Sequence, residues 1–112
     1  MSSSELNYPW KTPRAHPRFL LDVRLTVRAK ETMHGRTKDV GEGGVGATIP
    51  GTIEKGEFVE LEFQLPGTTE PLRFKSEVRY NQGFQYGFKF LHATDRQREM
   101  IRKATRDLPP AP

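Results

Sequence analysis

The sequence predicts a small all-antiparallel β-domain, a barrel or sandwich of five or six strands, closed by one C-terminal α-helix. Short segments in which apolar and polar residues alternate fill most of residues 19–91, and clusters of glycine and proline separate them. Only residues 94–108 show a helical spacing of apolar residues. With 112 residues the chain has the length of one domain.

The N-terminal residues predict an extended arm and then a strand. Residues 1–18 hold three prolines among polar and basic residues and have neither a helical nor a strand period. From Phe19 to Ala29 every odd position is apolar and most even positions are polar, which predicts one half-buried strand. We therefore divide the chain into a flexible arm (1–13), a domain (14–108, with its barrel at 19–91) and a tail (109–112).

The next two strands are expected on either side of a glycine-rich run. One runs from Gly35 to Val40 after a turn at His34-Gly35, and the other from Val45 to Ile49. Between them glycine occupies positions 41, 43, 44 and 46. Because glycine loses the most backbone entropy on folding, such a cluster indicates a sharp turn or a close approach of the backbone to another group.

Three more strands complete the expected sheet, at residues 57–65, 72–80 and 84–90. Pro66-Gly67 begins a hairpin loop between the first two, and Asn81-Gln82-Gly83 is the expected turn between the last two. Six aromatic residues on these strands are assigned to the barrel core and its cross-strand pairs: Phe74, Tyr80, Phe84, Tyr86, Phe88 and Phe90.

The helix is predicted from its capping residues and its apolar stripe. Thr94 is a good N-cap with Gln97 three residues later, and Met100, Ala104 and Leu108 recur every four residues before Pro109-Pro110. The narrow stripe indicates a helix that covers one end or edge of the barrel.

Composition excludes several classes of protein and site. There is no cysteine, so disulfides and thiolate metal sites are excluded, and the three histidines lack a metal-ligand spacing. No nucleophilic triad is indicated, and the glycine run lacks the Lys-Ser/Thr ending of a phosphate-binding loop; we expect no enzyme. No apolar run approaches ~20 residues and no signal peptide is indicated, so we expect a cytoplasmic protein without membrane insertion.

Charge is distributed unevenly along the chain, whose net charge is +4. Residues 1–38 carry eight Lys/Arg and three Asp/Glu, residues 39–77 carry three and eight, and residues 78–112 carry seven and three. Basic ends around an acidic middle can attract an anionic partner to one surface.

Two motifs remain, Arg14-Ala-His-Pro-Arg18 in the arm and Asp39-Val-Gly-Glu-Gly-Gly44 after the second strand. Together with the strand order, the Tyr86-Gly-Phe-Lys-Phe90 segment and the closing helix, they resemble the PilZ domain. That family pairs an RxxxR motif before the first strand with a later D/N-x-S-x-x-G motif on a six-stranded split barrel followed by a helix. The resemblance extends from about Arg14 to Leu108.

The resemblance implies a stand-alone receptor for the second messenger cyclic di-GMP, with no cofactor and with Arg14, Arg18, Asp39, Gly41 and Gly44 as ligand-binding residues. Arginine suits this ligand because its guanidinium pairs with phosphate or with guanine O6 and N7 and stacks on a purine. Asp39 is expected to accept hydrogen bonds from guanine, and Gly44 to permit a close approach of the ligand. Binding is expected to change the conformation of the arm and the surface shown to an effector protein.

One position departs from the family motif, because Gly41 stands where the motif has serine. The missing hydroxyl is expected to weaken binding by roughly three- to thirtyfold, and Gly41→Ser to restore it. Two alternatives stay open: a degenerate PilZ module that binds proteins without nucleotide, and a small basic barrel that binds single-stranded nucleic acid. The latter is disfavoured because the aromatic residues fall on the inward period. A homodimer, in which the helix packs on a neighbouring barrel, also stays open.

Overall fold

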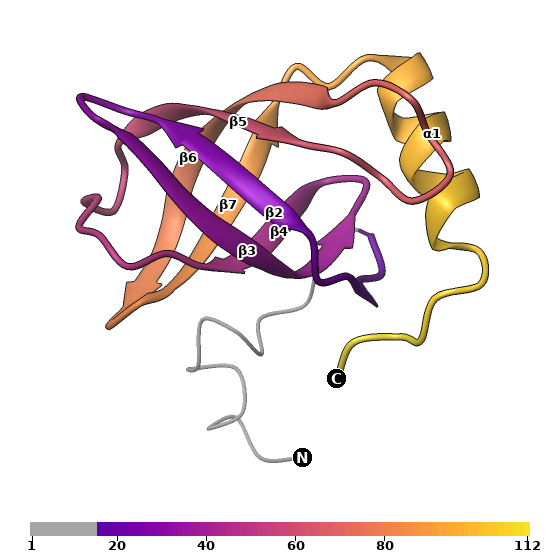
Figure 1. The fold of residues 1–112 in the computed structure, drawn as a ribbon, viewed down its shortest axis with the longest axis horizontal. Coiled ribbons are helices and arrows are strands. Elements are labelled where there is room, and N and C mark those ends of the chain that lie inside the picture. The colour runs from indigo at the N-terminus through magenta and orange to yellow at the C-terminus, as the bar shows by residue number, and fades with distance from the viewer. Residues whose placement is uncertain (1–15) are drawn as a thin grey trace.

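A closed antiparallel β-barrel forms the body of the protein, and one helix lies across its end (Figure 1). The computed structural model describes residues 16–112. Within them the strands are β1 (Phe19–Leu20), β2 (Arg24–Arg28), β3 (Thr32–Gly41), β4 (Gly44–Thr48), β5 (Phe58–Phe63), β6 (Leu72–Gln82) and β7 (Gln85–Leu91), and the helix is α1 (Asp95–Thr105). The predicted fold class is confirmed, with one short strand beyond the six of the barrel.

Strand pairing closes the barrel. The sheet order is β1-β3-β2-β5-β6-β7-β4, and a further pairing between β3 and β4 joins its ends, so that β3, β2, β5, β6, β7 and β4 form a ring. β1 lies outside the ring against the end of β3, where Phe19 faces Val40 and Leu20 faces Asp39. Residues 109–111 run beside β1, because Leu20 N–H donates to the Pro109 carbonyl and Ala111 N–H donates to the Arg18 carbonyl.

The single strand predicted from Phe19 to Ala29 is divided in two by a buried threonine. Its alternation is correct, since Leu21, Leu25 and Val27 are buried. At residues 21–23, however, the Thr37 hydroxyl takes over ladder hydrogen bonds: it accepts from Val23 N–H at 2.9 Å and donates to the Leu21 carbonyl at 2.5 Å. β1 and β2 are thus two short strands on one longer partner, β3.

The turn predicted at His34-Gly35 is wrong, because both residues lie inside β3. The chain reverses at residues 29–31, and Gly35 of β3 pairs with Leu25 of β2. A Cβ on Gly35 would lie 2.3 Å from the Thr48 carbonyl oxygen. This glycine therefore permits a close approach of β3 and the end of β4, and does not make a turn.

Four of the six aromatic residues assigned to the core are buried, and two are exceptions. Phe74 and Phe90 stack with ring centroids 3.9 Å apart, and Tyr86 and Phe88 are also buried. Phe84 is wrongly assigned to the core: its side chain is 61% exposed, because residues 83 and 84 form the two-residue turn between β6 and β7. Tyr80 is only half-buried, since a register shift in β6 lies between Val78 and Tyr80.

Helix α1 begins as predicted and ends three residues earlier. The Thr94 hydroxyl accepts from Gln97 N–H and the Gln97 side chain accepts from Thr94 N–H, which forms the expected capping box. At the other end Leu108 N–H donates to the Thr105 carbonyl in a tighter turn, because the residue before a proline is driven out of the helical region. The helix packs on the core through Ile101, which is 1% exposed and which the sequence pattern missed.

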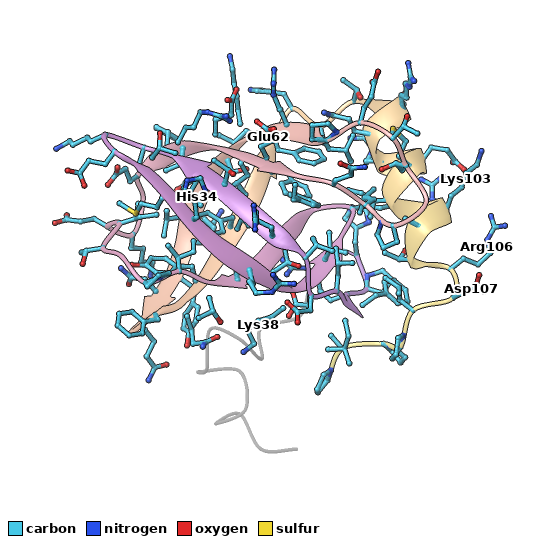
Figure 2. All side chains as sticks on the ribbon, in the orientation of Figure 1. His34, Lys38, Glu62, Lys103, Arg106 and Asp107 are labelled. Atoms are coloured by element: carbon cyan, nitrogen blue, oxygen red, sulfur yellow. The ribbon has the colours of Figure 1, made fainter. Side chains whose placement is uncertain are left out.

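The outward side of α1 and its C-terminal turn carry charge. Lys103, Arg106 and Asp107 point away from the barrel (Figure 2). Among residues 16–112, no helix combines the length and the apolar character that a bilayer-spanning segment requires.

Candidate functional site

A β-bulge in β3 directs Asp39 onto the outer face of the barrel. Thr37 pairs with Ala47 and Asp39 with Gly46, so Lys38 is an extra residue without a partner on β4. Thr37 and Val40 are both buried although they are three positions apart, and strict alternation would not allow this. The bulge places Lys38 and Asp39 together on the outside, and the polar pair between two buried residues is the sequence signal for it.

Arg18 and Asp39 meet at the end of the barrel. Arg18 Nη1 lies 2.7 Å from Asp39 Oδ1, and the two side chains are 14% and 20% exposed. The same carboxylate oxygen accepts from Gly46 N–H at 3.1 Å. The pair is therefore largely screened from water and fixed by the backbone of β4, which makes it stronger than an ordinary surface ion pair.

Two glycines let the Arg18 segment approach the β3–β4 turn closely. A Cβ on Gly41 would lie 2.4 Å from the Pro17 carbonyl oxygen and 2.9 Å from Arg18 Cδ. A Cβ on Gly44 would lie 2.2 Å from the Phe88 carbonyl oxygen and 2.9 Å from Arg18 Nη2. Within the described residues, these glycines make room for the protein's own chain, and a serine at position 41 would displace Pro17.

Helix α1 holds the glycine turn through an ion pair. Arg102 Nη2 and Nε lie 3.0 and 3.1 Å from the two carboxylate oxygens of Glu42, which sits in the turn between Gly41 and Gly43. These hydrogen bonds hold the pKa of the Glu42 carboxyl below its ordinary value and raise the pKa of Arg102. Arg102 also contacts Glu99 on its own helix. The turn that carries the second motif is thereby tied to the helix.

A row of four residues crosses the outer face next to the ion pair. Asp39 pairs with Gly46, Gly46 with Gly87, and Gly87 with Tyr80, across four neighbouring strands. Cβ atoms on Gly46 and Gly87 would lie 2.9 Å from the Asp39 carboxylate and 3.3 Å from Tyr80 Cβ, respectively. A carboxylate and a phenol ring thus stand at the two ends of a floor that has no side chains.

The structure brings together four of the five predicted site residues: Arg18, Asp39, Gly41 and Gly44. The fifth, Arg14, lies outside the described residues. Sequence reasoning missed Glu42 and Arg102, because nothing in the pattern shows that α1 reaches the glycine turn. It also assigned Tyr80 to the core. The register shift between Val78 and Tyr80 in β6 moves this side chain outward but leaves the alternation of apolar and polar residues almost unchanged.

Metal binding has no structural support in the described part of the chain. Among residues 16–112, no three or more His, Cys, Asp or Glu side chains are grouped so as to hold a metal ion. His16 lies against Gly43. His34 is on the outer face of β3, where its Nδ1 lies 3.4 Å from Thr26 Oγ1.

Structures similar to this chain are PilZ domains. The PilZ domain of YcgR from Escherichia coli, solved with c-di-GMP, has a TM-score of 0.70 and 15% identity, and the match covers 87% of this chain and 92% of that one. The PilZ domain of CeSA from a cellulose-synthesizing bacterium has a TM-score of 0.62 and 16% identity, with coverages of 80% and 94%. At these identities the similarity shows the fold.

A third similar structure belongs to a larger protein. The inhibitor of motility MotI/DgrA from Bacillus subtilis has a TM-score of 0.68 and 15% identity, and the match covers 85% of this chain but 51% of that one. The search of curated proteins found no match to the sequence.

The match to a family model spans the fold and the positions of both motifs. The model of the PilZ domain matches residues 12–107, which include the RxxxR motif, the whole barrel and the helix. The chain belongs to the PilZ domain family.

Proposed function

We propose that this protein is a cyclic di-GMP receptor whose ligand binds over Arg18, Asp39 and the glycine turn. The observation that carries the proposal is the screened Arg18–Asp39 pair beside Gly44, which joins the second arginine of the first motif to the second motif. The YcgR PilZ domain, whose fold this chain shares, was solved with c-di-GMP. Arg14 belongs to the proposed site through its place in the RxxxR motif.

The chemistry of the site suits a guanine nucleotide with phosphodiester groups. Asp39 Oδ1 accepts from Arg18 and Gly46, while Oδ2 has no hydrogen-bond partner among the described residues. We assign Oδ2 the role of acceptor for a guanine N–H. Gly46 and Gly87 have no side chains that would exclude a flat ring from this floor, and the aromatic ring of Tyr80 stands at its far side.

The readout is proposed to pass through the segments that flank Arg18. The Arg18 carbonyl accepts from Ala111 N–H, and Leu20 N–H donates to the Pro109 carbonyl. A movement of Arg18 onto a ligand therefore pulls on the C-terminal residues, and the Glu42–Arg102 pair transmits a movement of the glycine turn to α1. Both would alter the surface available to an effector protein.

A calorimetric titration with cyclic di-GMP tests the proposal. We expect saturable heat with one or two ligands per chain, and loss of that heat in Arg18→Ala. Thermal unfolding should show that this variant remains folded, with a Tm lowered by the loss of the screened ion pair. Arg96→Ala is the matched control, because Arg96 is an exposed arginine in the first turn of α1, at the opposite end of the helix from Arg102. Absence of heat in the wild-type protein at high ligand concentration would refute the proposal.

A PilZ module that binds a protein partner without nucleotide is the second candidate. It is favoured by Gly41, since the Pro17 carbonyl occupies the space in which the side chain of the motif serine would begin. In that case the titration gives no heat, while the fold and the Arg18–Asp39 pair remain intact.

A further inference from the structure

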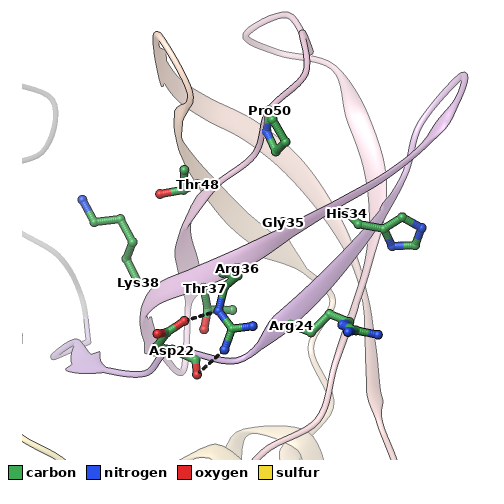
Figure 3. A pocket seen from close by; sticks show the side chains of 9 residues that line it. All are labelled: Asp22, Arg24, His34, Gly35, Arg36, Thr37, Lys38, Thr48 and Pro50. Carbon is green, nitrogen blue, oxygen red and sulfur yellow. Dashed lines mark hydrogen bonds and ion pairs between the residues drawn. The ribbon is translucent and has the colours of Figure 1, made fainter.

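A groove with a surplus of positive charge lies on the outer face of β2, β3 and β4, beside the proposed nucleotide site. Its volume is about 780 Å³, within the range of small-molecule sites. Arg24, Arg36, Lys38 and Asp22 carry its charges, and His34 lies at its rim (Figure 3). Arg18, Asp39, Gly41 and Gly44 are not among its lining residues.

Two arginines of this groove stand directly opposite each other in the sheet. Arg24 of β2 pairs in register with Arg36 of β3, and both side chains are exposed. Like charges on directly opposed positions destabilise a sheet. Of the two arginines, only Arg36 has its charge neutralised by a carboxylate. Its Nε lies 2.5 Å from Asp22 Oδ1, and its Nη2 donates to the Asp22 carbonyl. Arg24 forms no ion pair or hydrogen bond with a side chain in residues 16–112.

The other end of β2 contrasts with the groove. Arg28 lies 2.7 Å from Glu62 and 3.5 Å from Glu60, so β5 neutralises it with two carboxylates. The groove has three cations and only one carboxylate. Lys38 donates a hydrogen bond to the neutral Gln85 amide, so this contact does not reduce the surplus of positive charge. The bulge that turns Asp39 outward also adds Lys38 to this face.

We propose that the groove is a second anion site, which binds the phosphate group of a small phosphate ester or pyrophosphate. Phosphate suits it because each guanidinium group presents several donors in a planar fork and carries permanent charge, and two of them come from directly opposed residues. A bound phosphate removes the repulsion between Arg24 and Arg36, which the protein otherwise retains. Thr48 and Pro50 form the wall on the β4 side and leave room for the organic part of the ligand.

The test is a titration of the full chain with pyrophosphate at constant ionic strength, followed by NMR of the arginine Nε–H and backbone amide groups. We expect saturable shifts at Arg24, Arg36 and Gly35, and affinity reduced by roughly tenfold or more in Arg24→Gln. Arg79→Gln, with the same change of charge outside the groove, should bind like the wild type. A linear response, an equal response to sulfate, or full affinity of Arg24→Gln would overturn the proposal.

Two further measurements separate this site from the nucleotide site and from a folding defect. Arg18→Gln should leave the pyrophosphate shifts at Arg24 unchanged, whatever it does to cyclic di-GMP binding; loss of those shifts would place the anion at Arg18 and overturn the proposal. Without anion at low salt, Arg24→Gln should have a Tm equal to or above that of the wild type, because it removes the repulsion from Arg36. A lower Tm would show that Arg24 has a structural role and would contradict the proposal.

Discussion

The two proposed sites on the outer face of β3 differ in whether their cationic side chains are paired with carboxylates. At one end Arg18 is paired with Asp39 and Arg102 with Glu42, so each cation has a carboxylate partner within the protein. In the groove Arg24 faces Arg36, and a single carboxylate serves three cations. Pairing fixes the geometry of a side chain before a ligand arrives, whereas a surplus of positive charge favours a highly charged phosphate over a less charged anion such as sulfate. We therefore expect the first region to confer selectivity and the second to confer general affinity for phosphate.

The largest difference between the regions should come from their two close-approach glycines. Gly44→Ala and Gly35→Ala each place a Cβ 2.2 or 2.3 Å from a backbone carbonyl oxygen, so both should lower the free energy of unfolding by roughly 1–3 kcal/mol. Only Gly44→Ala should also abolish cyclic di-GMP binding. Denaturant unfolding and calorimetry on both variants measure this, and loss of binding in Gly35→Ala would show that binding follows overall stability.

Tyr80 tests whether the glycine floor belongs to the first region. Tyr80→Ala should lower the affinity for cyclic di-GMP by roughly tenfold, because stacking of a base on an aromatic ring contributes ~1–3 kcal/mol. Tyr80→Phe retains the ring and should bind like the wild type. Equal affinity of Tyr80→Ala and wild type in the titration would exclude Tyr80 from the site.

Gly41→Ser tests how tightly the arm is docked. The sequence motif alone predicts that the serine restores affinity, but its Cβ would lie 2.4 Å from the Pro17 carbonyl oxygen and would push Arg18 away from Asp39. We therefore expect the opposite result, a lower Tm and an affinity reduced by roughly fivefold. Tighter binding by this variant, measured in the same titration, would mean that the ligand-bound arm lies elsewhere.

The smallest effect is expected at the ion pair between the glycine turn and α1. Arg102→Gln should weaken cyclic di-GMP binding by roughly two- to fivefold, which is the scale of an exposed ion pair, and should lower Tm slightly at neutral pH. Lys103→Gln, its exposed neighbour on α1, is the control.

The same pair should show a defined pH dependence. Because the pKa of Glu42 in the folded protein lies below its ordinary value of 4.5, the pair stabilises the fold above that value, and this contribution is lost as the pH falls through the lower folded pKa. The difference in Tm between Arg102→Gln and the wild type should therefore disappear in acid. A difference that persists there would assign the effect to helix packing.

Most of the barrel was predictable from the sequence, because its inward positions alternate and its turns contain glycine or proline. The errors occur where a contact with a distant part of the chain, and not the local alternation, determines the backbone. The Thr37 hydroxyl divides the first strand, and Gly35 serves close packing in place of a turn. Both depend on contacts between residues more than ten positions apart, which a local period does not encode.

The candidate site was predictable as a set of residues but not as a geometry. The two motifs identified Arg18 and Asp39, and the polar pair Lys38-Asp39 between buried residues is a local signal for the β-bulge. The contact of α1 with the glycine turn depends on tertiary packing alone. The groove around Arg24 was not predictable, because the opposition of Arg24 and Arg36 depends on the register of β2 and β3.

The central claim is that Arg18 and Asp39 act as one unit in nucleotide recognition, and a double-mutant cycle on cyclic di-GMP affinity tests it most directly. The cycle compares Arg18→Gln, Asp39→Asn and the double variant by calorimetry. We predict that each single variant loses most of the affinity for cyclic di-GMP. The double variant should bind only slightly more weakly than the single variant with the lower affinity. Losses that add, or single variants that bind like the wild type, would contradict the claim.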